Sequence, residues 1–285
     1  MTREQKRTIG TFLRYVLLIA VGIIMVYPLI WMVGASFKTN SEIFSSVGFI
    51  PKNPVITGYV KGFAGYEGMT LLHFMANTYK IVLPKVIVTL VSATITAYGF
   101  ARFDFFGKKF SFAVLMSTLF LPQVVLNVPQ YILFNELGWL DSYLPLVVPS
   151  ILAGDTYFVY MLIQFQRGIP KELEEAAQID GCSIMKTLWY VLVPMLKPAI
   201  VSCGLFQFMW ASNDFMGPLI YVNTVAKFPV SIFLRMSMDA EVGFEWNRVL
   251  AMSLLAIIPS LVVFFSAQNS FVDGIAAGGG EGEKL

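Results

Sequence analysis

The segment Gly168–Tyr190 reads GIPKELEEAAQIDGCSIMKTLWY, and it is a compact acidic patch in the middle of an apolar chain. Glu172, Glu174 and Glu175 follow Pro170 closely. Proline suits the first turn of a helix, and the helix dipole favours negative charge there. The segment therefore predicts a short helix that starts near Pro170.

The residues after the glutamates give this helix a small tip. Ala176 and Ala177 let another surface approach the backbone, and Gly181 can end the helix without steric cost. Two interpretations remain open: docking to a protein partner, or an amphipathic helix on the membrane surface. Docking is favoured, because a helix that lies on anionic lipid is usually basic and this one is acidic.

Composition indicates that the rest of the chain lies in a bilayer. Of 285 residues, 56% are hydrophobic and 13% are charged, against about 25% charged in an average soluble domain. The net charge is only +2 and the basic residues are dispersed, which argues against nucleic acid as a partner. Cys182, Cys203 and the single His73 form no metal-binding or disulfide pattern. We expect an integral membrane protein with no catalytic or metal-binding residues.

Six apolar runs are long enough to cross about 30 Å of hydrocarbon as helices. They are residues 12–37, 81–101, 110–134, 144–165, 188–212 and 249–271. The expected architecture is an all-α membrane protein that forms a single transmembrane domain over residues 1–285. Residues 166–187 would be the segment between the fourth and fifth spans, and residues 272–285 would be a tail.

The basic residues predict the orientation of these spans. An even number of spans puts both termini on one side, and the side with more Lys and Arg is cytoplasmic. That side would hold Arg3, Lys6, Arg7, Arg14, Arg102, Lys108, Lys109, Arg167, Lys171, Lys186, Lys197 and Lys284. The smaller external set would be Lys38, Lys52, Lys61, Lys227, Arg235 and Arg248. We therefore expect cytoplasmic termini and a cytoplasmic acidic segment.

Several motifs resemble the permease subunits of ABC importers. The run Glu175, Ala176, Ala177, Gly181, Val191, Val193 and Pro194 resembles their signature, in which Glu-Ala-Ala precedes a glycine and an Ile-x-Leu-Pro. The two valines are mild departures from that signature. The stretches AYGFARFDFFGKK (97–109), WASNDFMGPLIY (210–221) and KFPVSIFL (227–234) are similar to the carbohydrate permeases of the maltose type. The resemblance covers nearly the whole chain.

The resemblance implies a type I importer fold in a bacterial plasma membrane. It also implies a heteromeric complex with a second permease, two cytoplasmic ATPase subunits that hold ATP and Mg, and an external binding protein that delivers sugar. Glu175, Ala176, Ala177, Asp180 and Gly181 would form the knob seated in an ATPase cleft. This chain would carry no cofactor and would not hydrolyse ATP, since Gly107 and Lys108 lack the upstream glycine of a phosphate loop.

Polar side chains inside the predicted spans mark a candidate substrate path, because such residues are costly in lipid. The set comprises Gln123, Asn127, Gln130, Gln207, Trp210, Asn213 and Asp214. The first three are spaced by four and three residues and so share one helical face. They could bind sugar hydroxyls, or they could only hydrogen-bond between helices. Asp214, with Lys227 and Arg235, could belong to an external gate or to the dock for the binding protein.

Three alternatives to a sugar importer remain. An embedded enzyme has no supporting motif. An ion-coupled secondary transporter would often show paired halves, which this sequence lacks. Glycerol phosphate or an acidic oligosaccharide could replace a neutral sugar within the same importer class. Lys80 and Lys85, near the outer end of the second span, are expected to snorkel to the outer surface, although an anionic oligosaccharide would benefit from their charge.

Overall fold

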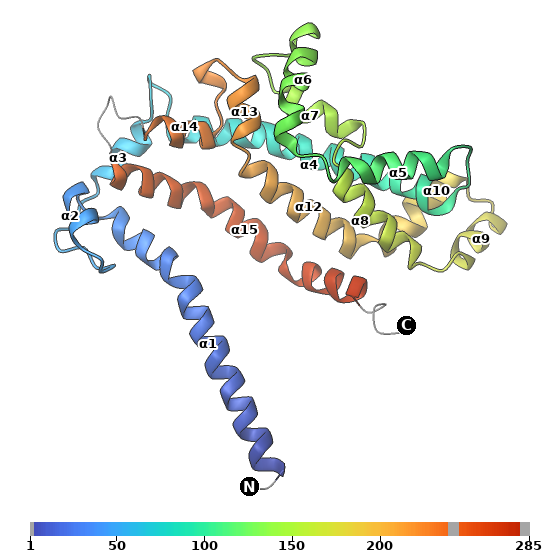
Figure 1. Ribbon diagram of the computed structural model, residues 1–285, viewed down its shortest axis with the longest axis horizontal. Coiled ribbons are helices and arrows are strands. Elements are labelled where there is room, and N and C mark those ends of the chain that lie inside the picture. The colour runs from blue at the N-terminus through green and yellow to red at the C-terminus, as the bar shows by residue number, and fades with distance from the viewer. Residues whose placement is uncertain (1–2, 239–244, 280–285) are drawn as a thin grey trace. The chain divides into compact units, whose positions relative to one another are not determined.

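The regular secondary structure in the described part of the chain is helical (Figure 1). The computed structural model describes residues 3–238 and 245–279, with side chains for 10–238 and 245–268. Within those ranges no β-strand occurs beyond one isolated bridge between Tyr66 and Met69. The all-α class is therefore confirmed, while residues 280–285 of the predicted tail lie outside the described part.

Helices overlap all six of the predicted apolar ranges. The long ones are α1 (Arg3–Ser36), α4 (Leu71–Arg102) and α15 (Trp246–Gly279). The middle of the chain holds α5 (Lys108–Thr118), α6 (Gln123–Glu136), α7 (Leu144–Ile151), α8 (Thr156–Arg167), α9 (Glu172–Ile179), α10 (Ile184–Thr187), the π-helix η1 (Leu188–Leu192), α11 (Val193–Met195) and α12 (Lys197–Ser212). The short remaining elements are α2 (Asn40–Ser45), α3 (Thr57–Ala64), α13 (Met216–Tyr221), the 3-10 helix η2 (Val225–Lys227) and α14 (Val230–Met236).

Four helical segments are long and apolar enough to cross a membrane. They are Gly10–Ser36, Leu71–Arg102, Leu144–Arg167 and Trp246–Gln268. Two helix pairs reach this length only together, α5 with α6 and α10–α11 with α12, and they bend by 105° and 80°. The described chain thus has four to six candidate spans, and the boundaries predicted from the sequence stay predictions.

The chain divides into two compact units. One unit holds Met1–Leu72 and Phe233–Ile257, and the other holds His73–Ile232 and Ile258–Leu285. In the first unit, the fully buried Lys38 donates from Nζ to the carbonyl oxygen of Ser46 at 3.0 Å. Gly58 packs so closely that an added Cβ would lie 2.6 Å from the carbonyl oxygen of Asn247. The first contact holds the segment around α2 together, and the second places α3 against the start of α15.

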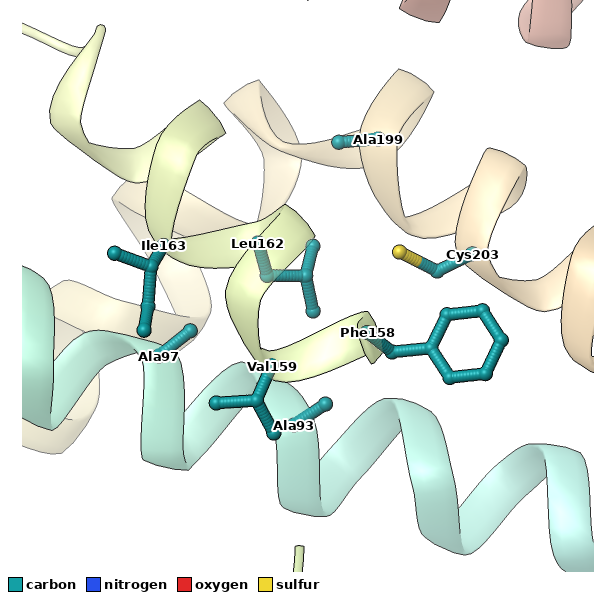
Figure 2. Packing of buried hydrophobic residues seen from close by; sticks show 8 residues of the cluster. All are labelled: Ala93, Ala97, Phe158, Val159, Leu162, Ile163, Ala199 and Cys203. Atoms are coloured by element: carbon teal, nitrogen blue, oxygen red, sulfur yellow. The ribbon is translucent and has the colours of Figure 1, made fainter. Parts of the chain in front are cut away.

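The core of the second unit is a junction of α4, α8 and α12 (Figure 2). Small side chains on α4 and α12 face large ones on α8. The buried set is Ala93, Ala97, Phe158, Val159, Leu162, Ile163, Ala199 and Cys203. Small residues let membrane helices approach closely, so that van der Waals packing can hold them together without a hydrophobic driving force. This packing fixes α4 against α8.

Breaks interrupt the helices on one side of this core. Between α7 and α8, Ala153 adopts a left-handed φ of 57°. Its N–H donates to Ser92 Oγ at 2.8 Å, and the N–H of Gly154 donates to the carbonyl oxygen of Pro149 at 3.2 Å. Non-helical backbone at membrane depth is tolerated only when it is buried in protein or lines a cavity. The break is therefore stabilised from within the bundle.

Asp141 connects the loop before α7 to the loop after α13. Its Oδ1 accepts the N–H groups of Asn223 and Thr224 at 3.0 and 2.8 Å, and its Oδ2 accepts Lys227 Nζ at 2.9 Å. Lys227 therefore pairs with Asp141 and forms no ion pair with Asp214. Hydrogen bonds from the hydroxyl and N–H of Thr224, and from Lys227, hold the pKa of Asp141 well below its usual range.

We expect the Asp141 contacts to make folding stability depend on acid pH. Because the folded pKa is lowered, this stabilisation is complete above the ordinary carboxyl pKa of about 4 and is lost as the pH falls through the folded pKa. Asp141→Asn should lower the melting temperature of the detergent-solubilised chain at neutral pH, and the difference from the parent chain should shrink in acid. Glu136→Gln, which removes an exposed carboxyl, is the control. An unchanged difference across the pH range would contradict this assignment.

Candidate functional site: an acidic helix and a polar cavity

The acidic segment forms the short helix α9, as the sequence predicts. Glu172, Glu174 and Glu175 occupy its first turn. The helix begins at Glu172 with Lys171 as its N-cap residue, so Pro170 lies just before the helix. The glutamates thus lie where the helix dipole favours negative charge.

Gly181 ends α9 in a left-handed turn with φ of 82°. The N–H of Cys182 donates to the carbonyl oxygen of Ala177 at 2.9 Å, and the N–H of Gly181 donates to that of Gln178 at 3.0 Å. These two bonds make a Schellman motif, in which glycine is the preferred residue. Asp180, the expected cap of this turn, is the C-cap residue of the helix.

The helix has an inner and an outer face. Glu174 and Ala177 are buried, with exposed fractions of 6% and 8%. Glu175 and Ala176 are exposed on the outer face. Ile179 is also exposed, at 87%, and the sequence interpretation did not include it in the knob. Of the predicted knob residues, Ala177 faces inward while Glu175, Ala176 and Asp180 face outward.

A buried ion pair attaches the inner face of α9 to the end of α4. Arg102 Nε lies 2.5 Å from Glu174 Oε1, and their side chains are only 5% and 8% exposed. The two atoms form no aligned hydrogen bond, so the contact is mainly electrostatic. Arg102 Nη2 also donates to the carbonyl oxygen of Ile169 at 2.7 Å, which fixes the chain entering α9.

An apolar cluster supports this ion pair. Tyr98 on α4 packs with Leu188, Leu192 and Leu196, which follow α9 along η1 and α11. In the sequence, Ile184, Leu188 and Val191 are spaced as on one face of an α-helix. The buried stripe instead uses every fourth residue, and the path bends by 80° before α12. The π-helical turn of η1 shifts the register relative to an α-helix.

A second feature is a polar cavity of about 410 Å³ in the same unit. Amide side chains line one side, from Gln123, Asn127 and Gln130 on α6. Gln123 Nε2 donates to Gln130 Oε1 at 3.3 Å, and the Tyr221 hydroxyl donates to the same oxygen at 3.3 Å. Gln207, Trp210 and Asp214 also line the cavity. The volume is within the usual range for small-molecule sites, about 300–1,000 Å³.

The cavity brings together all but one of the predicted path residues. Asn213 is exposed and donates to the carbonyl oxygen of Met209 on its own helix at 2.8 Å. Trp210 packs 5.2 Å from the ring centres of Tyr157 and Phe158, yet it is half-exposed. Two cavity residues that the sequence interpretation did not assign to the path are Lys85 and Asp155.

Comparison with known proteins identifies the family. Residues 93–272 match the model of the binding-protein-dependent transport system inner membrane component. The match covers more than half of the chain and includes α9 and most of the cavity wall. This chain belongs to that family.

Relatives of this transport component align over nearly its full length. The galactooligosaccharides transport system permease protein GanQ of Bacillus subtilis is 30% identical over 97% of this chain and 98% of its own. The trehalose/maltose transport system permease protein MalG of Thermococcus litoralis is 29% identical over 93% of this chain and 95% of its own length. A chain in the crystal structure of a bacterial ABC transporter involved in the import of the acidic polysaccharide alginate shares the fold, with a TM-score of 0.80, 20% identity and coverage of 95% and 99%.

We expect the left-handed turn at Gly181 to be essential for coupling in this transport component. Gly181→Val should leave the protein inserted but reduce uptake and separate it from ATP hydrolysis, because a β-branched residue strongly disfavours this backbone region. Gly181→Asn should have a smaller effect, since Asn tolerates the left-handed conformation. Cys182→Ser is the matched control. Membrane vesicles carrying well-expressed variants would be compared, and normal coupled uptake by Gly181→Val would refute the expectation.

We also expect the buried Arg102–Glu174 pair to be costly to break from one side. Glu174→Gln or Arg102→Met alone should lower the free energy of unfolding by about 3–5 kcal/mol, because one charge stays buried without its partner. The double variant Arg102→Met with Glu174→Leu should regain most of this loss. Thermal melting in detergent compares the stability of the single variants and of the double variant with that of the parent chain. A single variant that melts like the parent chain would show that the two charges are not coupled.

Proposed function

We propose that this chain is one of two membrane subunits of an ATP-driven importer that takes sugars, in particular oligosaccharides, from an external binding protein into the cytoplasm by alternating access. In this proposal the chain crosses the membrane six times with both termini in the cytoplasm. A second permease and two ATPase subunits complete the complex, and ATP and Mg belong to the ATPases. The observation that carries the proposal is α9, an exposed acidic helix anchored to a membrane helix.

The shape of α9 suits docking into a protein cleft. The exposed Ile179 offers an apolar contact, and the exposed Glu175 and Asp180 flank it with negative charge. An apolar cleft with basic residues at its edge would complement this tip. A helix lying on lipid would instead need basic residues on its polar face. We therefore assign the tip of α9 to the ATPase interface.

The anchoring of α9 allows motion at that interface to reach the cavity. Arg102 joins α9 to the end of α4, and the leucines after α9 join it to the path into α12. Both α4 and α12 contribute residues to the cavity wall, including Lys85 and Gln207. Closure of an ATPase dimer against α9 would thus move two walls of the cavity.

The chemistry of the cavity supports a sugar as the substrate. Amides offer both donors and acceptors to hydroxyl groups, and the half-exposed Trp210 offers a ring face on which a sugar ring can stack. Gln123, Asn127, Gln130, Gln207, Trp210 and Asp214 would form the substrate path. Two full-length relatives are named for oligosaccharide or disaccharide transport, which supports the same substrate class.

An anionic solute is the second candidate within the same importer class. Lys85 lines the cavity and would attract a carboxylate or a phosphate. An acidic oligosaccharide or glycerol phosphate would use this charge. The two carboxylates of Asp155 and Asp214 line the same cavity and would repel an anionic solute.

We expect uptake to depend on ATP and to be independent of ion gradients. The complete complex would be reconstituted in liposomes with ATP inside and the binding protein outside, and labelled sugars retained by that binding protein would be supplied. Uptake should stop when ATP is omitted or replaced by a non-hydrolysable analogue. It should continue when ionophores collapse the sodium and proton gradients, whereas the reverse pattern would support a secondary transporter and refute the proposal.

A further inference from the structure

Asp155 occupies the break between α7 and α8, where it is part of the cavity wall. Ile151 ends α7 and Thr156 starts α8, and the residues between them are not helical. Gly154 and Asp155 both line the cavity. Asp155 is the N-cap residue of α8, yet its side chain does not cap the helix. Its carboxylate is therefore available for other contacts.

Two buried side chains hold one oxygen of this carboxylate. Thr89 Oγ1 donates to Asp155 Oδ2 at 2.6 Å, and Gln207 Nε2 donates to the same oxygen at 3.0 Å. Gln207 Nε2 also lies 2.9 Å from Thr89 Oγ1. Thr89 is 1% exposed and Gln207 is 2% exposed. The orientation of the carboxylate is thus fixed from α4 and α12.

The other carboxylate oxygen remains open. Among the residues that the structure describes, none donates a hydrogen bond to Asp155 Oδ1, and Asp155 is only half-buried. A carboxylate can accept several hydrogen bonds, and bonds from a neutral donor to a charged acceptor are stronger than neutral ones. A hydroxyl group in the cavity would find such an acceptor at Oδ1.

The charges around the cavity favour an uncharged ligand. Two carboxylates, Asp155 and Asp214, face one ammonium group, Lys85. Asp214 Oδ1 already accepts the N–H of Gly217 at 3.0 Å. A carboxylate or phosphate on the substrate would meet net negative charge in this cavity, and like charges repel.

We propose that Asp155 Oδ1 accepts hydroxyl groups of an uncharged sugar and disfavours anionic sugars, with Thr89 and Gln207 as its positioning residues. This inference rests on the proposed function. It makes this subunit a determinant of substrate choice, in addition to whatever its partner permease contributes. Removing the charge of Asp155 should weaken transport of neutral sugars and reduce the discrimination against anionic ones.

The test uses the complete transporter with its binding protein in liposomes. Three uncharged trisaccharides serve as probes, galactotriose, maltotriose and arabinotriose, together with trigalacturonate as the carboxylated counterpart of galactotriose. For the carried sugar, Asp155→Asn should raise the KM for uptake about tenfold, as expected for loss of a charge-assisted hydrogen bond. It should also raise uptake of trigalacturonate relative to galactotriose. Thr89→Val should raise the KM as well. Thr89→Ser, which keeps the hydroxyl, should leave the KM close to that of the parent complex.

The outcomes separate this inference from the proposed function. If the parent complex shows no ATP-driven uptake of any sugar, both are overturned. If it carries an uncharged sugar, but Asp155→Asn leaves both the KM and the ratio of neutral to anionic uptake unchanged, only the role of Asp155 is overturned. A variant that lowers the melting temperature and slows all uptake equally, without changing the ratio, likewise shows a structural role and overturns the inference.

Discussion

The contact between Arg102 and Glu174 is the point on which the placement of α9 against α4 depends. Arg102 is the last residue of α4, and Glu174 lies on the inner face of α9, so a single buried pair joins a membrane helix to the exposed acidic helix. The pair explains why two adjacent glutamates behave differently: Glu174 is buried and bound to Arg102, whereas Glu175 is exposed. Ion pairs in such surroundings tolerate little rearrangement, because either charge alone would be left without solvation. The tip of α9 is therefore held in one position relative to α4.

Helix α4 connects this contact to the cavity. Thr89 and Arg102 are both on α4, and a helical rise of 1.5 Å per residue separates them by about 20 Å along its axis. At its end α4 positions the acidic helix, and near its middle it positions the carboxylate of Asp155 through Thr89. The cavity itself lies where the α7–α8 path is broken, and Gly154 and Asp155 from that break both line it. Interrupted helices at binding sites are common in membrane transporters, because the freed backbone groups can face a cavity in place of lipid.

Local patterns were sufficient to predict much of this structure. The spacing of Gln123, Asn127 and Gln130 predicted one shared face, and all three line the cavity. Gly181 and the glutamates before it predicted a short capped helix, which is present. The pairing of Arg102 with Glu174 could not be predicted in this way, because the two residues are far apart in the sequence. Asp155 was missed because an apolar run shows the length of a span but not a break inside it. The buried stripe of Leu188, Leu192 and Leu196 runs through the π-turn at η1, and the spacing of apolar residues in the sequence did not reveal that turn.

The alanines at the junction of α4 and α8 have a mechanical consequence. Ala93 and Ala97 on α4 pack in one buried cluster with Val159 and Ile163 on α8. Close-packed surfaces resist gradual deformation, so this pair would travel as a rigid body during the transport cycle. The bending would then concentrate at the hinges that already exist, the 80° corner before α12 and the 105° corner between α5 and α6.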